Sequence, residues 1–63
     1  MKANKIKKYR EKAKLTQQDL GKKIGATQGM ISQYESGIRT PNISIALKLS
    51  KALNVSLERL FMS

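Results

Sequence analysis

The segment from residue 16 to residue 36 constrains the fold most, because it holds two helix starts on either side of one glycine. Thr16 and Thr27 are good N-cap residues, and an apolar residue precedes each of them. Gly25 lies where the first helix ends, and glycine adopts the left-handed backbone of a helix C-terminus more easily than other residues. The sequence therefore predicts two short helices, at about 16–24 and 27–36, joined by a tight turn.

The first of these helices has a strong start and one weak position. Asp19 stands three residues after Thr16, as in a capping box, and Leu15 and Leu20 are spaced as a hydrophobic staple. Gly21 lies in the helix interior, where glycine costs about 1 kcal/mol relative to alanine. Two interpretations of Gly21 stay open here: close approach of another helix, or simple tolerance of a weak residue.

The second helix has two different edges. At about 100° per residue, Met30, Ile31 and Tyr34 gather on one edge, which we expect to face the core. Glu35 falls at the margin, and Gly37 ends the helix. The opposite edge consists of small or polar residues, namely Gln28, Gly29, Ser32, Gln33 and Ser36. We expect this edge to contact a partner.

Helical periodicity continues on both sides of this segment. A helix is predicted at 4–14, with Ile6, Tyr9, Arg10 and Ala13 on one face. A short helix capped by Ser56 is predicted near the C-terminal end.

Between them, a helix at 43–53 is predicted to begin after Asn42 and to end at Asn54 in a left-handed conformation. Its expected buried face consists of Ile43, Ala46, Leu47, Ser50 and Leu53, with Leu49 beside it. Five short helices with short connections predict a compact all-α fold and one domain over residues 1–63.

The composition excludes several classes of protein. The 63 residues include no cysteine and no histidine, so disulfides, thiolate metal sites and the commonest general base are absent. With no base–nucleophile arrangement and a small core, we expect neither an enzyme nor a cofactor or metal. No apolar run approaches the ~20 residues of a membrane span, and no signal peptide is evident, so we expect a cytoplasmic protein.

The charge points to a polyanionic partner. Thirteen Lys and Arg against four Asp and Glu give a net charge of +9, more than solubility alone requires. Nucleic acid is the first candidate, and an anionic membrane surface is the second. The 4–14 helix has only a thin apolar face, which argues against the membrane.

The segment 15–41 resembles the Cro and lambda-repressor-like (XRE-like) helix-turn-helix family. The residues that match the family pattern are Leu15, Thr16, Gln17, Leu20, Gly25, Ala26, Thr27, Ile31, Ser32, Tyr34, Glu35, Gly37 and Pro41. The resemblance implies a five-helix lambda-repressor-like DNA-binding domain with its helix-turn-helix at about 16–36. It also implies a bacterial or phage transcriptional regulator, most often a repressor, that inserts the 27–36 helix into the major groove of double-stranded DNA.

The polar edge of the 27–36 helix supplies the candidates for base contacts. Gln28 is the first candidate, Gln33 the second and Ser32 the third, because Gln pairs with adenine through two hydrogen bonds and Ser addresses several bases. The alternative is that these polar side chains are merely solvated. Gly29 departs from the family, which usually carries a base-contacting side chain at that position.

A second set is expected to contact the DNA backbone. Gln17 begins the 16–24 helix, where its amide and the helix N–H groups can meet a phosphate, and the resemblance implies the same role. The other expected backbone contacts are Thr27, Gly37, Arg39, Lys22 and Lys23. The family usually has a basic residue where this chain has Ile38, so no phosphate contact is expected there.

Glu35 needs a partner, because phosphate repels a carboxylate near a DNA-facing surface. Arg10 on the inner face of the 4–14 helix is the candidate, and members of the family with both residues form such a pair. The alternative is an exposed, unpaired Glu35.

Assembly and use of the fold leave alternatives open. A palindromic operator read by a homodimer is expected for this motif. Leu57, Phe61 and Met62, with the connector after the 27–36 helix, are candidates for a small symmetric contact, although we expect Leu60 and Phe61 to complete the core. An antitoxin or protein-interaction module on the same fold is the alternative function, and a cationic membrane-surface protein a weaker one.

Overall fold

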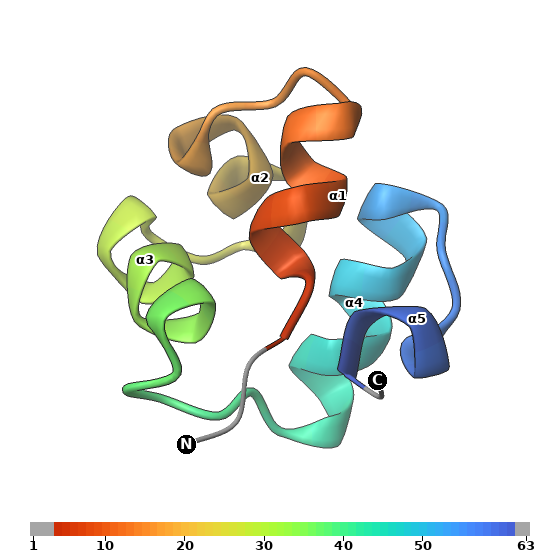
Figure 1. Ribbon diagram of the computed structural model, residues 1–63. Helices are drawn as coiled ribbons and strands as arrows, with labels where there is room; N and C mark the ends of the chain where they lie inside the picture. The colour runs from red at the N-terminus through yellow and green to blue at the C-terminus, as the bar shows by residue number, and fades with distance from the viewer. Residues whose placement is uncertain (1–3, 62–63) are drawn as a thin grey trace.

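The computed structural model describes residues 4–61, and within this range it contains five α-helices (Figure 1). In chain order they are α1 (Ile6–Lys12), α2 (Gln17–Ile24), α3 (Gln28–Ser36), α4 (Ile43–Leu53) and α5 (Leu57–Phe61). The Cα atoms extend over 25 × 22 × 20 Å. The all-α, five-helix prediction is therefore confirmed.

Helices α2, α3, α4 and α5 begin where the sequence provides caps, and the first three of them also end at predicted C-terminal residues. Thr16 Oγ1 accepts a hydrogen bond from the Asp19 N–H at 2.9 Å, and Asp19 Oδ2 accepts one from the Thr16 N–H at 3.0 Å, which completes the predicted capping box. Side-chain oxygens of Thr27, Asn42 and Ser56 accept N–H groups in the same way at the starts of α3, α4 and α5. The predicted left-handed residues are present at Gly25, Gly37 and Asn54.

Helix α1 is shorter than the predicted 4–14 helix at both ends. Asn4 lies outside the helix, and its Oδ1 accepts the Ile6 N–H at 3.1 Å. Lys14 adopts a left-handed backbone with φ 61°, and the Leu15 N–H donates to the Arg10 carbonyl at 3.1 Å. This bond closes the end of α1 and turns the chain toward α2.

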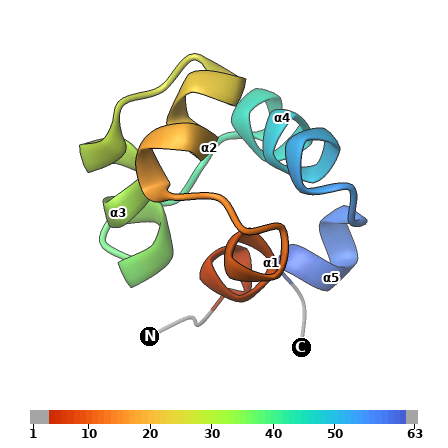
Figure 2. The same cartoon turned by 90° about the horizontal axis from the view of Figure 1, so that it is seen from above.

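The core lies between two helix pairs. Helices α2 and α3 lie side by side on one side of the molecule and α4 and α5 on the other, with α1 covering the open side between them (Figures 1 and 2). All five helices contribute to one buried cluster, which consists of Ile6, Leu20, Ile24, Ile31, Tyr34, Leu49, Leu53 and Leu60. Helices this short are marginal alone, so the shared core holds them in place.

The predicted buried face of α4 is wrong in part. Ala46, Leu49 and Leu53 are buried, but Ile43 is 73% exposed and Leu47 is 48% exposed. Apolar residues occupy most of this helix, so their periodicity alone does not fix its rotation. Contacts with α1, α2 and α5 turn the face of α4 that centres on Leu49 inward.

Gly21 allows a close approach of backbone, as one of the two interpretations predicted. A Cβ atom at this position would lie 2.6 Å from the carbonyl oxygen of Ala26 and 3.3 Å from the carbonyl carbon of Thr27. The neighbour is the turn that leads into α3. Because only glycine fits here without a shift, Gly21 helps to set the angle between α2 and α3.

Candidate nucleic-acid interface

Helix α3 presents its polar edge to solvent. Ile31 and Tyr34 are buried, while the side chains of Gln28 and Ser32 are exposed and that of Gln33 is half-buried. The helix lies on the side of the molecule away from α4 and α5 (Figure 1). The three predicted base-contacting residues therefore lie along one accessible edge, and their contact with bases stays a prediction.

A buried ion pair holds this helix to the start of the chain. Arg10 is only 9% exposed, and its Nε lies 2.5 Å from Glu35 Oε2. Its Nη2 donates to Glu35 Oε1 at 3.4 Å, and its Nη1 donates to the Leu15 carbonyl at 2.8 Å. The predicted pair is present, and it removes the problem of an unpaired carboxylate beside the exposed edge. A charged side chain is tolerated in a buried position when it is paired with an opposite charge and hydrogen-bonded.

Gln17 joins the same network. Its Nε2 donates to Glu35 Oε1 at 3.0 Å, so the carboxylate accepts hydrogen bonds from both α1 and the first residue of α2. An amide nitrogen has two N–H groups, and this bond uses one of them. The second N–H is available at the N-terminus of α2, where an anion is favoured.

Arg39 and Gln33 form a contact that the sequence did not suggest. Arg39 Nε donates to Gln33 Oε1 at 3.0 Å, and the Arg39 backbone N–H donates to the Gln33 carbonyl at 3.2 Å. The chain reverses at Gly37, whose φ is 85°, and this turn returns Arg39 to the last turn of α3. A residue predicted to contact bases and one predicted to contact the backbone are therefore linked.

Asn4 is a further positioning residue that the sequence interpretation missed. Its Nδ2 donates to the Tyr34 carbonyl at 2.7 Å, while its Oδ1 caps the start of α1. Carbonyls in the last turn of a helix lack i+4 partners, and the Tyr34 carbonyl of α3 accepts from Asn4 as well as from the Gly37 N–H. An asparagine just before a helical pattern was the available signal, but its second partner lies 30 residues away.

The remaining backbone candidates differ in their surroundings. The Gly37 N–H already donates to the Tyr34 carbonyl at 3.3 Å, and Thr27 Oγ1 already caps α3. Lys22 is exposed, whereas Lys23 lines a surface depression together with Lys48, Lys51 and Ala52 of α4. The structure thus places Lys23 next to other cations.

The capping box also affects a titration. The Thr16 backbone N–H, followed by its hydroxyl, stabilises the Asp19 carboxylate and lowers the pKa of Asp19 below its ordinary value of 3.8. The nearby Lys22 and Lys23 act in the same direction. Asp19 therefore remains ionised beside the positive end of α2.

Comparison with known proteins identifies the family. A family model described as helix-turn-helix matches residues 6–60. The chain belongs to the XRE-like helix-turn-helix family. The crystal structure of the P22 c2 repressor in complex with synthetic operator 9T has a TM-score of 0.88 and 40% sequence identity, over 92% of this chain and 88% of that one.

Other relatives of this helix-turn-helix chain come from distant organisms. An uncharacterized HTH-type transcriptional regulator of Methanocaldococcus jannaschii is 40% identical over 58 residues, which cover 92% of this chain and 88% of the relative. Multiprotein-bridging factor 1 of Debaryomyces hansenii is 42% identical over 52 residues, which cover 82% of this chain but only 35% of the yeast protein. Within residues 4–61, this helix-turn-helix chain has no helix with the length and apolarity of a membrane span.

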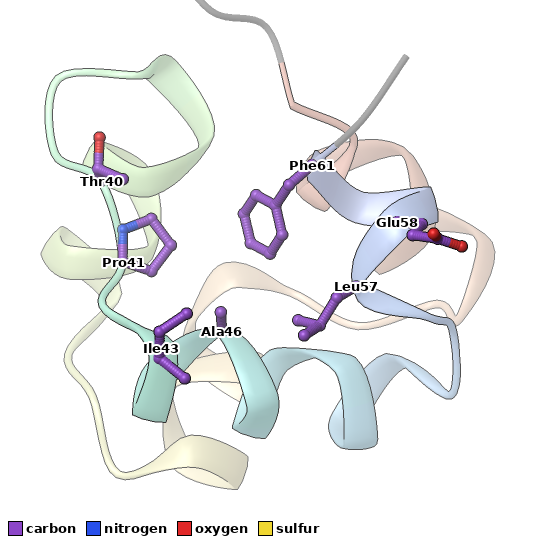
Figure 3. A pocket seen from close by; sticks show the side chains of 7 residues that line it. All are labelled: Thr40, Pro41, Ile43, Ala46, Leu57, Glu58 and Phe61. Carbon is purple, nitrogen blue, oxygen red and sulfur yellow. The ribbon is translucent and has the colours of Figure 1, made fainter.

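An apolar groove of about 330 Å³ lies beside the helix-turn-helix, between α4, α5 and the connector that follows α3 (Figure 3). The side chains of Pro41, Ile43, Leu57 and Phe61 surround it, and that of Glu58 points away from it (Figure 3). Thr40 and Ala46 complete the lining. Leu60 is fully buried, as expected, while Phe61 both packs against the core and borders the groove. Met62 lies outside the described residues.

Proposed function

We propose that this chain is a sequence-specific DNA-binding transcriptional regulator that represses by placing α3 in the major groove of an operator half-site. The observation that carries the proposal is the exposed polar edge of α3, held by the buried pair of Arg10 and Glu35. The likeness to the P22 c2 repressor, whose structure contains a synthetic operator, supports it. The net charge of +9 suits a polyanionic partner.

Base recognition is assigned to Gln28, Ser32 and Gln33. Gln28 is the first residue of α3 and is exposed, and the N-terminal residues of this helix are the ones that reach base edges in the motif. An amide in this position discriminates adenine through its N6 and N7, with about 1–3 kcal/mol for a good two-bond contact. Gly29 contributes no side chain, so fewer residues carry the specificity.

Backbone contacts position the protein without selecting a sequence. Gln17 donates its second amide N–H to a phosphate, and Glu35 orients the amide by accepting the first. Further contacts with the DNA backbone are assigned to Thr27, Gly37, Arg39 and Lys22. Lys23, which lies beside Lys48 and Lys51, adds to the long-range attraction between protein and DNA.

Two copies are proposed to bind a palindromic operator. Half-sites of this motif lie about one helical turn, 34 Å, apart, so the protomers meet beside their recognition helices. The apolar groove occupies such a place, because Thr40 and Pro41 of its lining follow α3 directly. A second copy of this chain, paired through Ile43, Leu57 and Phe61, buries this exposed apolar surface.

Selection of binding sites from random duplexes, repeated over a range of salt concentrations, tests the function. The expected result is a palindromic consensus, with affinity that falls as salt rises because phosphate contacts release counterions. Binding that depends on salt but yields no consensus contradicts the proposal.

One observation favours a second candidate, a protein-interaction module on the same fold. The relative from Debaryomyces hansenii carries the name multiprotein-bridging factor 1. The same selection separates the two functions, because an interaction module that does not recognise an operator returns no consensus at any salt concentration.

A further inference from the structure

The end of α3 contains a contact that limits how Gln33 can meet a base. Arg39 is attached to this one residue twice, through its guanidinium Nε at 3.0 Å and through its backbone N–H at 3.2 Å. The backbone bond follows from the left-handed turn at Gly37, so it fixes where the side chain of Arg39 begins. The guanidinium then lies at the oxygen end of the Gln33 amide.

The bond to Arg39 determines which end of the Gln33 amide can contact a base. A glutamine recognises adenine with both of its ends, because the oxygen accepts from N6 and the nitrogen donates to N7. Here the oxygen end is held by a cation, and a further N–H donor from adenine is repelled by the adjacent guanidinium charge. The two N–H groups of Gln33 Nε2 have no part in the bond to Arg39, so they are the groups left to contact a base.

We propose that Arg39 is a specificity-determining positioning residue, which makes Gln33 a hydrogen-bond donor and directs it to a keto-bearing base. In the major groove thymine presents the O4 acceptor and guanine presents two adjacent acceptors, O6 and N7. Cytosine presents a donor, and adenine presents a single acceptor, N7, beside its N6 donor. This inference rests on the proposed function. The sequence favoured adenine as the partner of both glutamines. At the base pair that Gln33 contacts, we now expect thymine or guanine.

Arg39 retains groups for a second task. Its Nε is used by Gln33, while Nη1 and Nη2 remain on an exposed side chain in the connector that follows α3. A guanidinium binds phosphate through such paired N–H groups. One residue therefore couples the position of the DNA backbone to the orientation of a base-contacting amide.

The base pair at which Gln33→Ala loses its preference is first identified. The test then measures the affinity of each protein for four duplexes that differ only at this base pair. Wild type is expected to favour thymine or guanine over adenine by about tenfold, the size of one good base contact. Arg39→Met frees the Gln33 amide to rotate, so the affinity for the duplex with adenine is expected to rise by about 5- to 10-fold relative to the duplexes with thymine or guanine. Overall affinity also falls in this variant, because a phosphate contact is lost.

Arg39→Lys distinguishes the effect of orienting the Gln33 amide from the effect of the positive charge at residue 39. Lysine keeps the positive charge, and with it the salt dependence, but has no Nε at this position, so the preference for keto bases is expected to disappear as in Arg39→Met. Lys22→Met is the matched control for charge, with weaker binding and an unchanged preference. The preference at the base pair of Gln28 is expected to stay the same in every Arg39 variant.

Several outcomes overturn the proposal. It is wrong if wild type prefers adenine at the Gln33 position, if Gln33→Ala changes no preference, or if both Arg39 variants keep the wild-type preference. The proposed function fails separately if the wild-type protein discriminates at no base pair of the duplex.

Discussion

The carboxylate of Glu35 connects three segments of the chain. It accepts hydrogen bonds from Arg10 of α1 and Gln17 of α2 while belonging to α3. The side chains of Arg10 and Glu35 are only 10% and 6% exposed, so neither charge has ready access to water as a substitute partner. The position of Gln17 and the attachment of α3 to α1 therefore depend on the same pair.

Replacing Arg10 alone is expected to lower the free energy of unfolding far more than replacing Arg10 and Glu35 together. Arg10→Met leaves the buried Glu35 carboxylate without its cation, which costs about 3–5 kcal/mol. A chain of 63 residues has roughly 3–9 kcal/mol of stability in total. Arg10→Met with Glu35→Leu should recover most of the loss, and Lys7→Met, on an exposed lysine of the same helix, is the control. Urea unfolding measures all four proteins; an Arg10→Met variant as stable as wild type contradicts the account.

Asp19 makes stability depend on pH in a defined direction. Its folded-state pKa is lowered by the Thr16 N–H, so its contribution is present above the ordinary pKa of 3.8 and is lost as the pH falls through the folded value. Asp19→Asn is expected to lose less stability than wild type between pH 6 and pH 3. Urea midpoints over that range measure the difference, with Glu11→Gln as the control for a lost surface charge. Equal slopes in wild type and Asp19→Asn contradict the prediction.

The sequence predicted which residues belong to the candidate site better than it predicted the hydrogen bonds between their side chains. The pair of Arg10 and Glu35 could be expected, since a carboxylate beside a DNA-facing edge needs a cation. The bonds of Gln33 with Arg39 and of Asn4 with Tyr34 could not, because each depends on the path of a turn or on the packing of distant segments.

The relative placement of α2 and α3 depends on the backbone at Gly21. Local capping signals predicted both helices and the turn between them, because caps depend on residues a few positions apart. The angle between the helices is a tertiary property. It requires the turn carbonyl of Ala26 to approach α2 within a distance that excludes a side chain.

The two helical glycines are expected to respond oppositely to alanine. At Gly21 a Cβ meets backbone at 2.6 Å, so Gly21→Ala forces a shift and destabilises by about 1–3 kcal/mol. At Gly29 the nearest atom is the Thr27 hydroxyl at 3.9 Å, so Gly29→Ala fits and stabilises by up to about 1 kcal/mol. Urea unfolding measures both. If Gly21→Ala is as stable as Gly29→Ala, the close approach does not set the helix angle.

The described part of the molecule combines an exposed polar edge on α3 with an apolar groove between α4, α5 and the connector after α3. The fold class and the helix order followed from caps and periodicity. The groove followed only in part. Leu57, Phe61 and the connector after α3 were predicted to share a contact surface, but Ile43 was predicted to be buried, and the rotation of α4 leaves it exposed at the groove. Packing against α1, α2 and α5 determines that rotation, and no local pattern records it.

The dimer is tested by neutral changes at two exposed isoleucines. Ile43 borders the groove and is 73% exposed, whereas Ile38 is 79% exposed and is not part of the lining. Ile43→Gln is expected to weaken binding to a two-half-site duplex about tenfold and to leave single half-site binding unchanged, because apolar area is lost between copies. Ile38→Gln is the matched control. Sedimentation with both duplexes measures this; equal effects of the two changes contradict the symmetric contact.

Recognition of bases by the exposed polar edge of α3 is tested by the variant Gln28→Ala. Equilibrium binding is measured to the selected operator and to its single-base variants, with Gln18→Ala, an exposed amide on α2, as the matched control. Gln28→Ala is expected to lose about 10- to 100-fold of discrimination at one base pair of each half-site and none elsewhere. Gln18→Ala should behave as wild type. Uniform weakening by Gln28→Ala across all duplexes, with every base preference retained, would show that Gln28 does not recognise a base.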